Sequence, residues 1–146
     1  MAADCRYLLV DGHSVIFHWS ELNRLHAVKP NQARELLVSQ LQQLHDCSDW
    51  RVTVVFDGKQ GAQEKPQPNQ VHVLYSRDGQ SADSIIEKIV GQQSDRSRIL
   101  VVTADEGERT TIEALGAHTA PPEWLKSEIA HYRTDLEQRM KRHSKK

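Results

Sequence analysis

Short apolar runs alternate with longer segments of helical period along this chain. The runs at 6–11, 51–57, 71–75 and 98–104 are predicted strands, and a weaker fifth candidate lies near 118–120. Such alternation is typical of parallel strands covered by helices on both faces of the sheet. The pattern therefore predicts a single-domain α/β fold of three layers, with a mostly parallel sheet of four to five strands.

Three segments have the period of amphipathic helices. The first begins at Pro30 and places five residues on one predicted core face: Ala33, Leu36, Leu37, Leu41 and Leu44. The second covers 82–90, with Ser81 as its cap. The third follows Pro121 and Pro122 and is expected to bury Leu125, Ile129, Tyr132 and Leu136. The polar segment 57–70 has no hydrophobic period and is predicted to be an exposed loop.

Length, charge and cysteine content narrow the class of protein. A chain of 146 residues suits one domain, which we place at 1–138, followed by a basic, disordered tail at 139–146. The net charge of −1 provides no overall basic field for nucleic acid, so any such contact must rely on local positive charge. Cys5 and Cys47 are far apart, which argues against a disulfide and favours a reduced, cytoplasmic setting. Neither a signal peptide nor a membrane span is expected.

Acidic residues follow the predicted strands. Asp11, Asp57 and Asp105 each come directly after an apolar run, and Asp83 stands at the start of the 82–90 helix. Ligands of open α/β sheets bind outside the carboxyl ends of the strands, where these acids would meet. Clustered carboxylates repel one another unless a cation or shared protons compensate. Oxygen ligands without thiolates favour Mg²⁺ or Mn²⁺, whose usual task is phosphate chemistry.

These acidic residues are also open to other interpretations. An aspartate after a strand is also a common N-cap of the next helix, so each acid taken alone remains open between a cap and a ligand. The chain has no P-loop or dinucleotide-binding glycine motif, and its eight histidines lack the spacing of a zinc site. Phosphotransfer at an aspartate is a further alternative. It is disfavoured because "VDGHS" lacks a second acid two residues on.

Several motifs together resemble a known family. They are "LLVDGHSVI" (8–16), "HWSEL" (18–22), "ARELL" (33–37), "VTVVFDG" (52–58), "YSRDGQSADSIIEKIV" (75–90) and "VVTADEGER" (101–109). In order and spacing they resemble the YacP-like group of NYN domains, within the PIN-like nuclease superfamily. The resemblance implies a PIN-like, Rossmann-like sheet and a Mg²⁺- or Mn²⁺-dependent endoribonuclease. It implies that Asp11, Asp83 and Asp105 are catalytic metal ligands and that Asp57 is a neighbouring catalytic acid.

The resemblance also singles out three supporting positions. Glu21 and Glu87 match acidic positions of the family, although Glu21 also suits a solvated helix and Glu87 a salt bridge. Ser14 stands where the family tends to have asparagine. Its hydroxyl can still donate and accept a hydrogen bond, so it can hold Asp11 or a water molecule. This departure leaves a second hypothesis open, that of an RNA-binding module with weak or no turnover.

RNA is the expected partner, and a ribosome or other ribonucleoprotein is a candidate to present it. Four basic residues are positioned to ring an acidic centre, or else are solvated surface charges: Lys59, Lys65, Arg77 and Arg109. Trp19 and Trp50 are candidates for stacking on bases, with buried packing as the alternative. The sequence thus predicts a metal-dependent endoribonuclease, with the RNA-binding module as its alternative.

Overall fold

The computed structural model describes residues 6–58, 67, 69–77 and 79–144, and its centre is a parallel sheet. The strands are β1 (Tyr7–Asp11), β2 (Arg51–Phe56), β3 (His72–Tyr75), β4 (Ile99–Val102) and β5 (His118–Ala120). They lie in the order β3-β2-β1-β4-β5, and every neighbouring pair is parallel. The predicted parallel sheet is confirmed, including the weak fifth strand.

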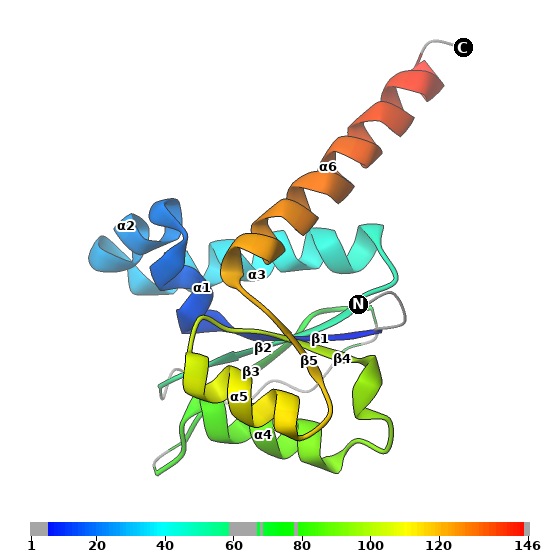
Figure 1. The fold of residues 1–146 in the computed structure, drawn as a ribbon. Coiled ribbons are helices and arrows are strands. Elements are labelled where there is room, and N and C mark those ends of the chain that lie inside the picture. Colours follow the sequence, from blue (N-terminus) through cyan, green and yellow to red (C-terminus); the bar gives the residue numbers. More distant parts are fainter. Residues whose placement is uncertain (1–5, 59–66, 68, 78, 145–146) are drawn as a thin grey trace.

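Helices cover both faces of this sheet (Figure 1). One face carries α1 (Gly12–His18), α2 (Ser20–Val28), α3 (Pro30–Cys47) and α6 (Pro122–Ser144). The other carries α4 (Ala82–Gln92) and α5 (Glu106–Ala114), and a short 3-10 turn (Arg96–Arg98) precedes β4. The predicted three-layer α/β architecture is therefore confirmed. The short helices α1, α2 and α5 were not delimited by the sequence pattern, because seven to nine residues hold too few turns to establish a period.

Successive residues of each strand enter the two core layers in alternation, as the pleat of a strand requires. Leu8 and Val10 pack beneath α1, α3 and α6, while Leu9 packs against α4 and α5. A sheet buried on both faces needs strands that are apolar at every position, and β4 (Ile99–Val102) is buried throughout. The continuous apolar runs in the sequence thus have a direct physical cause.

Two predicted core leucines are exposed. The buried stripe of α3 includes Ala33, Leu37 and Leu41, which follow one another at four-residue spacing. Leu36 directly precedes Leu37, lies outside this stripe and points to solvent. Leu136 is exposed on α6, which extends away from the body of the molecule in Figure 1. The same helix continues to Ser144, so the basic segment that begins at 139 is helical as far as it is described. Most of the predicted 57–70 loop lies outside the described residues.

The strand order creates a topological switch point. The chain moves outward from β1 to β2 and β3, and then returns to the other side of β1 to form β4 and β5. The connections that leave the carboxyl ends of β1 and β4 therefore run to opposite faces of the sheet. In open α/β sheets this is where ligands bind. Asp11 is the last residue of β1 and lies at this position.

Gly12 is required by the packing at the end of β1. A Cβ atom at this position would lie 2.3 Å from Cε1 of Phe56, whose ring is fully buried. We expect Gly12→Ala to lower the free energy of unfolding by about 1–3 kcal/mol, measured by urea denaturation. The matched control is Gly91→Ala in α4, where nothing lies within 4 Å, and it should leave the protein as stable or slightly more stable. Equal effects of the two substitutions would contradict this account.

Candidate metal centre at the sheet edge

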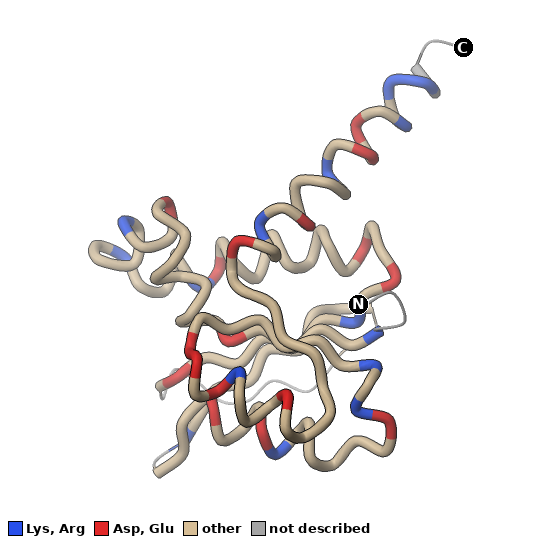
Figure 2. The backbone as a smooth tube through the Cα atoms, in the orientation of Figure 1, with Lys and Arg blue, Asp and Glu red and all other residues tan. Residues whose placement is uncertain are grey.

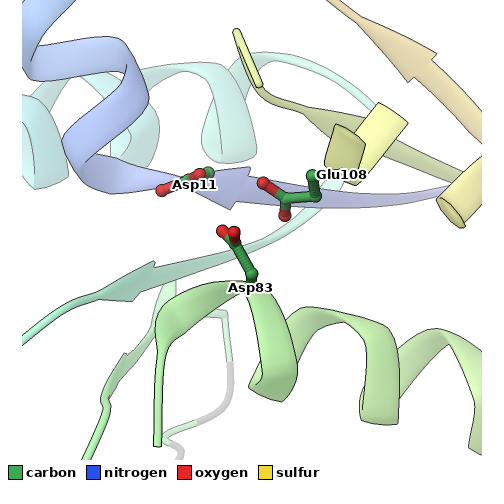
Figure 3. A group of neighbouring side chains, drawn as sticks. All are labelled: Asp11, Asp83 and Glu108. Atoms are coloured by element: carbon green, nitrogen blue, oxygen red, sulfur yellow. The ribbon is translucent and has the colours of Figure 1, made fainter. Parts of the chain in front are cut away.

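Three carboxylates meet at the switch point (Figure 3): Asp11, Asp83 and Glu108. One oxygen from each lies within 4.8 Å of the others. Figure 3 shows the three side chains converging from different elements, β1, α4 and α5. Asp11 and Glu108 are buried, at 6% and 3% exposure, and Asp83 is half-buried. The group therefore forms a semi-enclosed acidic centre rather than a solvated acidic surface.

Asp83 is positioned by the beginning of α4. Ser81 and Ser84 form a reciprocal capping box that starts the helix. The carboxylate of Asp57 accepts a hydrogen bond from the backbone N–H of Ala82 at 2.7 Å and thereby ties this end of α4 to the end of β2. The first turn of α4 consequently stands over the carboxyl edge, with Asp83 directed at Asp11 (Figure 3).

Glu108 is positioned by the beginning of α5. The side chain of Asp105 caps this helix by accepting the N–H of Glu108 at 3.0 Å. Glu108 Oε2 accepts a hydrogen bond from Thr103 Oγ1 at 2.8 Å. Its other oxygen, Oε1, is the single buried side-chain N or O atom among the described residues that has no N–H or hydroxyl partner, so only a proton shared with a neighbouring carboxylate can bridge it to the protein. A buried polar atom left in this way marks a place where a ligand is expected.

Hydroxyl groups connect these acids to the scaffold. The backbone N–H of Ala104 donates to Ser14 Oγ at 3.0 Å, and Ser14 Oγ lies 3.3 Å from Thr103 Oγ1. Thr103 is fully buried, and its Oγ1 also lies 3.3 Å from Asp11 Oδ2. Because a hydroxyl carries one proton, donation to Glu108 leaves Thr103 Oγ1 to accept from Ser14. Ser14 thus holds the end of β4 and, through Thr103, orients Glu108.

Burial and mutual repulsion shift the proton affinities of the acids. Burial, reinforced by the charge of Asp11 and by a hydrogen bond with Asp83 that requires a proton, raises the pKa of Glu108 to about 9. Burial also raises the pKa of Asp11; the hydrogen bond with Glu108 opposes that rise, and the charge of Asp83 adds to it. Without a cation, the centre therefore retains a proton at neutral pH, which relieves the repulsion between the carboxylates.

A divalent ion would resolve the same repulsion without a proton. The three oxygens are close enough to share one ion, all are hard carboxylate ligands, and no N–H or hydroxyl group of the described residues competes for Glu108 Oε1. This donor set suits Mg²⁺ or Mn²⁺ and does not suit a thiophilic metal. The residues present therefore fit the cofactor that the sequence predicted, although they do not distinguish between the two ions.

The structure divides the predicted acids into two groups. It brings Asp11 and Asp83 together, whereas Asp57 and Asp105 are exposed and direct their carboxylates to the starts of α4 and α5. Asp105 was expected to be a ligand, but its carboxylate accepts the backbone N–H of Glu108 at the start of α5. The third carboxylate of the group is that of Glu108. Asp57 correspondingly lies outside the three-carboxylate group, and its carboxylate holds the start of α4.

The supporting acids lie outside the three-carboxylate group. Glu21 is exposed in the first turn of α2. Glu87 is half-buried one turn after Asp83, and among the described residues it has neither a hydrogen bond nor an ion pair. The expected salt bridge of Glu87 is therefore not formed with a described residue. Within the described part of the chain, the centre is confined to β1 and the first turns of α4 and α5.

Glu108 and Thr103 are not among the residues predicted from the sequence. A signal for Glu108 exists, because it precedes the buried Ile112 by four residues and so shares the core-facing side of α5. Asp105 and Glu108 also have the spacing of a helix start, with an N-cap followed three residues later by glutamate. An N-cap followed three residues later by glutamate normally indicates only the start of a helix. For this reason the pattern did not mark Glu108 as a candidate ligand.

The predicted RNA contacts have mixed outcomes. Lys59 and Lys65 lie outside the described residues, and Arg77 is exposed just before α4. Arg109 bonds to Thr119 Oγ1 at 3.3 Å and pairs with Glu106, so its guanidinium is directed toward β5. The two tryptophans pack against α6 and its start. Trp19 is buried and donates to the backbone oxygen of Pro122, and the ring of Trp50 packs on that of Trp124.

Charge is distributed unevenly between the two ends of the strands. Figure 2 shows acidic residues gathered where β1 and β4 end and α4 and α5 begin. The opposite edge, where the strands begin, carries basic residues: Arg51 is the first residue of β2, and Arg6 and Arg98 directly precede β1 and β4. A cation is thus favoured at the carboxyl edge by the field of the surrounding acids as well as by its direct ligands.

Removing the cap of α5 should reveal the structural role of Asp105. We expect Asp105→Ala to lower the free energy of unfolding by about 1 kcal/mol, because the N–H of Glu108 loses its acceptor. Asp105→Asn should recover most of this loss, since asparagine is an equally good N-cap. The measurement is urea denaturation, combined with Mn²⁺ titration of each variant. If Asp105→Asn lowered Mn²⁺ affinity as strongly as Asp11→Asn, Asp105 would have to be counted among the ligands.

Two other features bear on the sequence-based expectations. Within the described part of the chain, no helix combines bilayer length with the apolar surface that spanning requires. Cys47 is a free thiol, and Cys5 lies outside the described residues.

Comparison with known proteins identifies the family. Residues 8–146 match the model of the YacP-like NYN domain. The uncharacterised protein YacP of Bacillus subtilis (strain 168) is 29% identical over 138 residues, which cover 92% of this chain and 81% of that protein. The crystal structure of Rae1 (YacP) from Bacillus subtilis superposes with a TM-score of 0.81 at 28% identity, covering 95% of this chain and 82% of that one. A tryptophan-to-leucine mutant of Rae1 also superposes with a TM-score of 0.81, at 27% identity and with coverage of 96% and 84%.

These matches confirm the resemblance inferred from the motifs. They agree with the PIN-like three-layer fold, and the acidic centre at the switch point is consistent with a nuclease-type function. The chain belongs to the YacP-like NYN domain family.

Proposed function

We propose that the protein is a metal-dependent endoribonuclease that hydrolyses phosphodiester bonds of RNA in the cytoplasm. The observation that carries the proposal is the convergence at the switch point of Asp11, Asp83 and Glu108, whose buried Oε1 has no N–H or hydroxyl partner among the described residues. Membership of a PIN-like nuclease family supports the reaction type. Mg²⁺ and Mn²⁺ are the proposed cofactors, and RNA, presented free or by a ribonucleoprotein such as the ribosome, is the proposed substrate.

In this proposal the three carboxylates hold the ion and the surrounding residues keep them in place. A bound divalent ion lowers the pKa of water and neutralises charge on the leaving oxygen. Glu108 must give up its proton for this role, and Thr103 keeps its Oε2 in a fixed orientation when it does so. Asp57 holds the start of α4 and so sets the reach of Asp83. The burial of Asp11 and Glu108 excludes bulk water from the inner side of the centre.

The test is cleavage of a mixed, end-labelled RNA pool with Mn²⁺, Mg²⁺ or EDTA. The wild type is compared with Asp11→Asn and Asp83→Asn, purified identically so that a contaminating nuclease would appear in all samples. Glu113→Gln, an exposed acid on the same helix as Glu108, is the matched control. We expect metal-dependent cleavage by the wild type and the control, and a loss on the order of a hundredfold or more in the two aspartate variants. Equal cleavage by all four proteins would reject the proposal.

A second candidate is an RNA-binding module without turnover. The observation that favours it is that the Ser14 hydroxyl is occupied by Ala104 and Thr103, which limits its use toward a substrate. This candidate predicts that the wild type binds RNA and Mn²⁺ but is as inert as Asp11→Asn in the cleavage assay. Phosphotransfer at an aspartate predicts a stable acyl-phosphate after treatment with a small phosphodonor, and we expect none.

A further inference from the structure

An aromatic group lies beside the acidic centre, on α1 and α2. It consists of His13, Phe17 and His26, whose ring centroids are separated by 5.0 to 5.9 Å. The ring of Phe56, which is fully buried, supports His13 from beneath at 5.7 Å. The aromatic group thus begins in the core and ends at the surface of α1, which stands over the carboxyl edge in Figure 1.

The outermost ring is unusually open. Phe17 is 49% exposed, while His13 and His26 are half-buried beside it. Phe17 and His26 meet edge to face at an interplanar angle of 76°, an arrangement that does not stack the faces of the two rings on each other. Single-stranded nucleic acid is commonly held by bases that stack on such exposed rings. A single exposed phenylalanine is common on protein surfaces and does not by itself indicate a binding site.

Arg34 is a buried cation on α3. Its side chain is only 9% exposed, and in the described part of the chain its one hydrogen-bond partner is Asn31 Oδ1. No described carboxylate forms an ion pair with it. A guanidinium is always charged and carries five N–H donors, so a buried one with a single amide partner lacks an anion. Planar guanidinium groups are well suited to phosphate.

Arg34 and the aromatic group belong to the same region of the molecule. α1 and α2 pack against α3, which carries Arg34. The ring of His13 on α1 contacts that of His26 on α2, so the aromatic group spans the two helices that pack on α3. His13 Nδ1 in turn accepts the backbone N–H of Asp57 at 3.1 Å, and His13 is two residues from Asp11. A cation, stacking rings and the acidic centre therefore adjoin one another.

We propose that this region is a nucleotide subsite for single-stranded RNA, in which Phe17 and His26 stack on an unpaired base and Arg34 binds its phosphate. The subsite rests on the proposed function, because it places the bound nucleotide next to the phosphodiester that the acidic centre would cleave. It further specifies the substrate, since a base paired in a duplex has no free face to present to Phe17.

The test measures binding separately from cleavage. Short single-stranded RNAs carry 2-aminopurine at successive positions and are titrated in EDTA and again in Mn²⁺. We expect the wild type to quench the fluorophore at one position, as stacking requires. Phe17→Ala should abolish this quenching and weaken binding roughly tenfold. Arg34→Gln should reduce the slope of log K against log salt by about 0.7, the value for one lost phosphate contact on a single strand, and Arg34→Lys should restore part of it.

The control for Phe17→Ala is Tyr7→Ala, which removes a ring of similar exposure (41%) at the opposite end of β1. Circular dichroism and thermal unfolding verify the fold of each variant, and because Phe17 is exposed its replacement should not unfold the protein. Unchanged quenching and affinity in Phe17→Ala, or no quenching by the wild type in either condition, would overturn the subsite. Quenching without cleavage would support the subsite and reject the nuclease function. Cleavage at the same rate in the wild type and in Phe17→Ala would support the nuclease function and reject the subsite.

Discussion

Glu108→Gln is expected to abolish metal-dependent RNA cleavage and, at the same time, to stabilise the metal-free protein. Cleavage should fall on the order of a hundredfold to a thousandfold, because an amide cannot replace the charge of a carboxylate ligand. Stability should rise because glutamine avoids the burial of a negative charge next to Asp11 and Asp83. Its amide nitrogen can also donate to Asp83, while its oxygen still accepts from Thr103.

The stabilisation should depend on pH in a defined direction. The pKa of Glu108 is raised from 4.5 to about 9 in the folded protein, so its stabilising protonation is fully present below 4.5 and is lost as the pH rises through about 9. We therefore expect little difference between wild type and Glu108→Gln at pH 4, and a gain of about 2–4 kcal/mol for the variant at pH 8. Urea denaturation in EDTA at the two pH values measures it. Glu113→Gln, the exposed control, should show no such pH dependence.

A variant that was less stable than wild type at pH 8 would contradict this account of the centre. It would mean that Glu108 is ionised and satisfied by the protein itself, without metal or proton. The combination of lost cleavage and gained stability is informative because general damage to the fold would lower both quantities. A strained, charged site of this kind is a familiar reason why functional residues are not the most stable choice.

Mn²⁺ affinity is expected to increase steeply with pH. Binding must displace the proton that Glu108 retains up to about pH 9, so the apparent affinity should rise close to tenfold per pH unit below that value. Between pH 6 and pH 8 this amounts to roughly a hundredfold. The raised pKa of Asp11 acts in the same direction. Isothermal titration calorimetry in buffers of different ionisation enthalpy measures both the affinity and the number of protons released.

The control for this experiment is Glu108→Gln, which has no proton to release at this position. Its residual Mn²⁺ binding should be weaker and should depend much less on pH. If wild-type affinity were constant between pH 6 and 8 and no proton were released, the centre would not share a proton in the metal-free state. The same titration then also reports whether Mn²⁺ stabilises the fold, since a ligand that binds only the folded state raises its stability.

The fold could largely be predicted from local patterns. Apolar strands without polar faces require a sheet covered on both sides, and the helical periods at Leu37 and Ile86 mark the covering layers. The weak fifth strand, β5 (His118–Ala120), is present because it pairs with β4, and three residues are enough for this pairing. The exposure of Leu36 was not predictable in this way, since a stripe drawn on a helix does not reveal how wide the covered face is.

The site was predictable only in part. Asp11 and Asp83 are recognisable because one ends a buried strand and the other begins a strongly amphipathic helix on the same rim. Asp105 and Glu108 are three residues apart, and no local feature of the sequence indicates which of the two carboxylates points into the core. That choice depends on the direction of α5 relative to β1, which the packing of Ile112 against the sheet determines.

By itself, the sequence determined the layers, the parallel strands and the edge at which the acids gather, because each of these follows from hydrophobic period and chain order. Only the tertiary structure decided which acids meet. Asp57 and Asp105 accept the N–H groups of Ala82 and Glu108 and so begin helices. Asp11, Asp83 and Glu108 face one another. A carboxylate that finds a backbone donor is satisfied locally, whereas three that are buried together without enough donors require a proton or a cation.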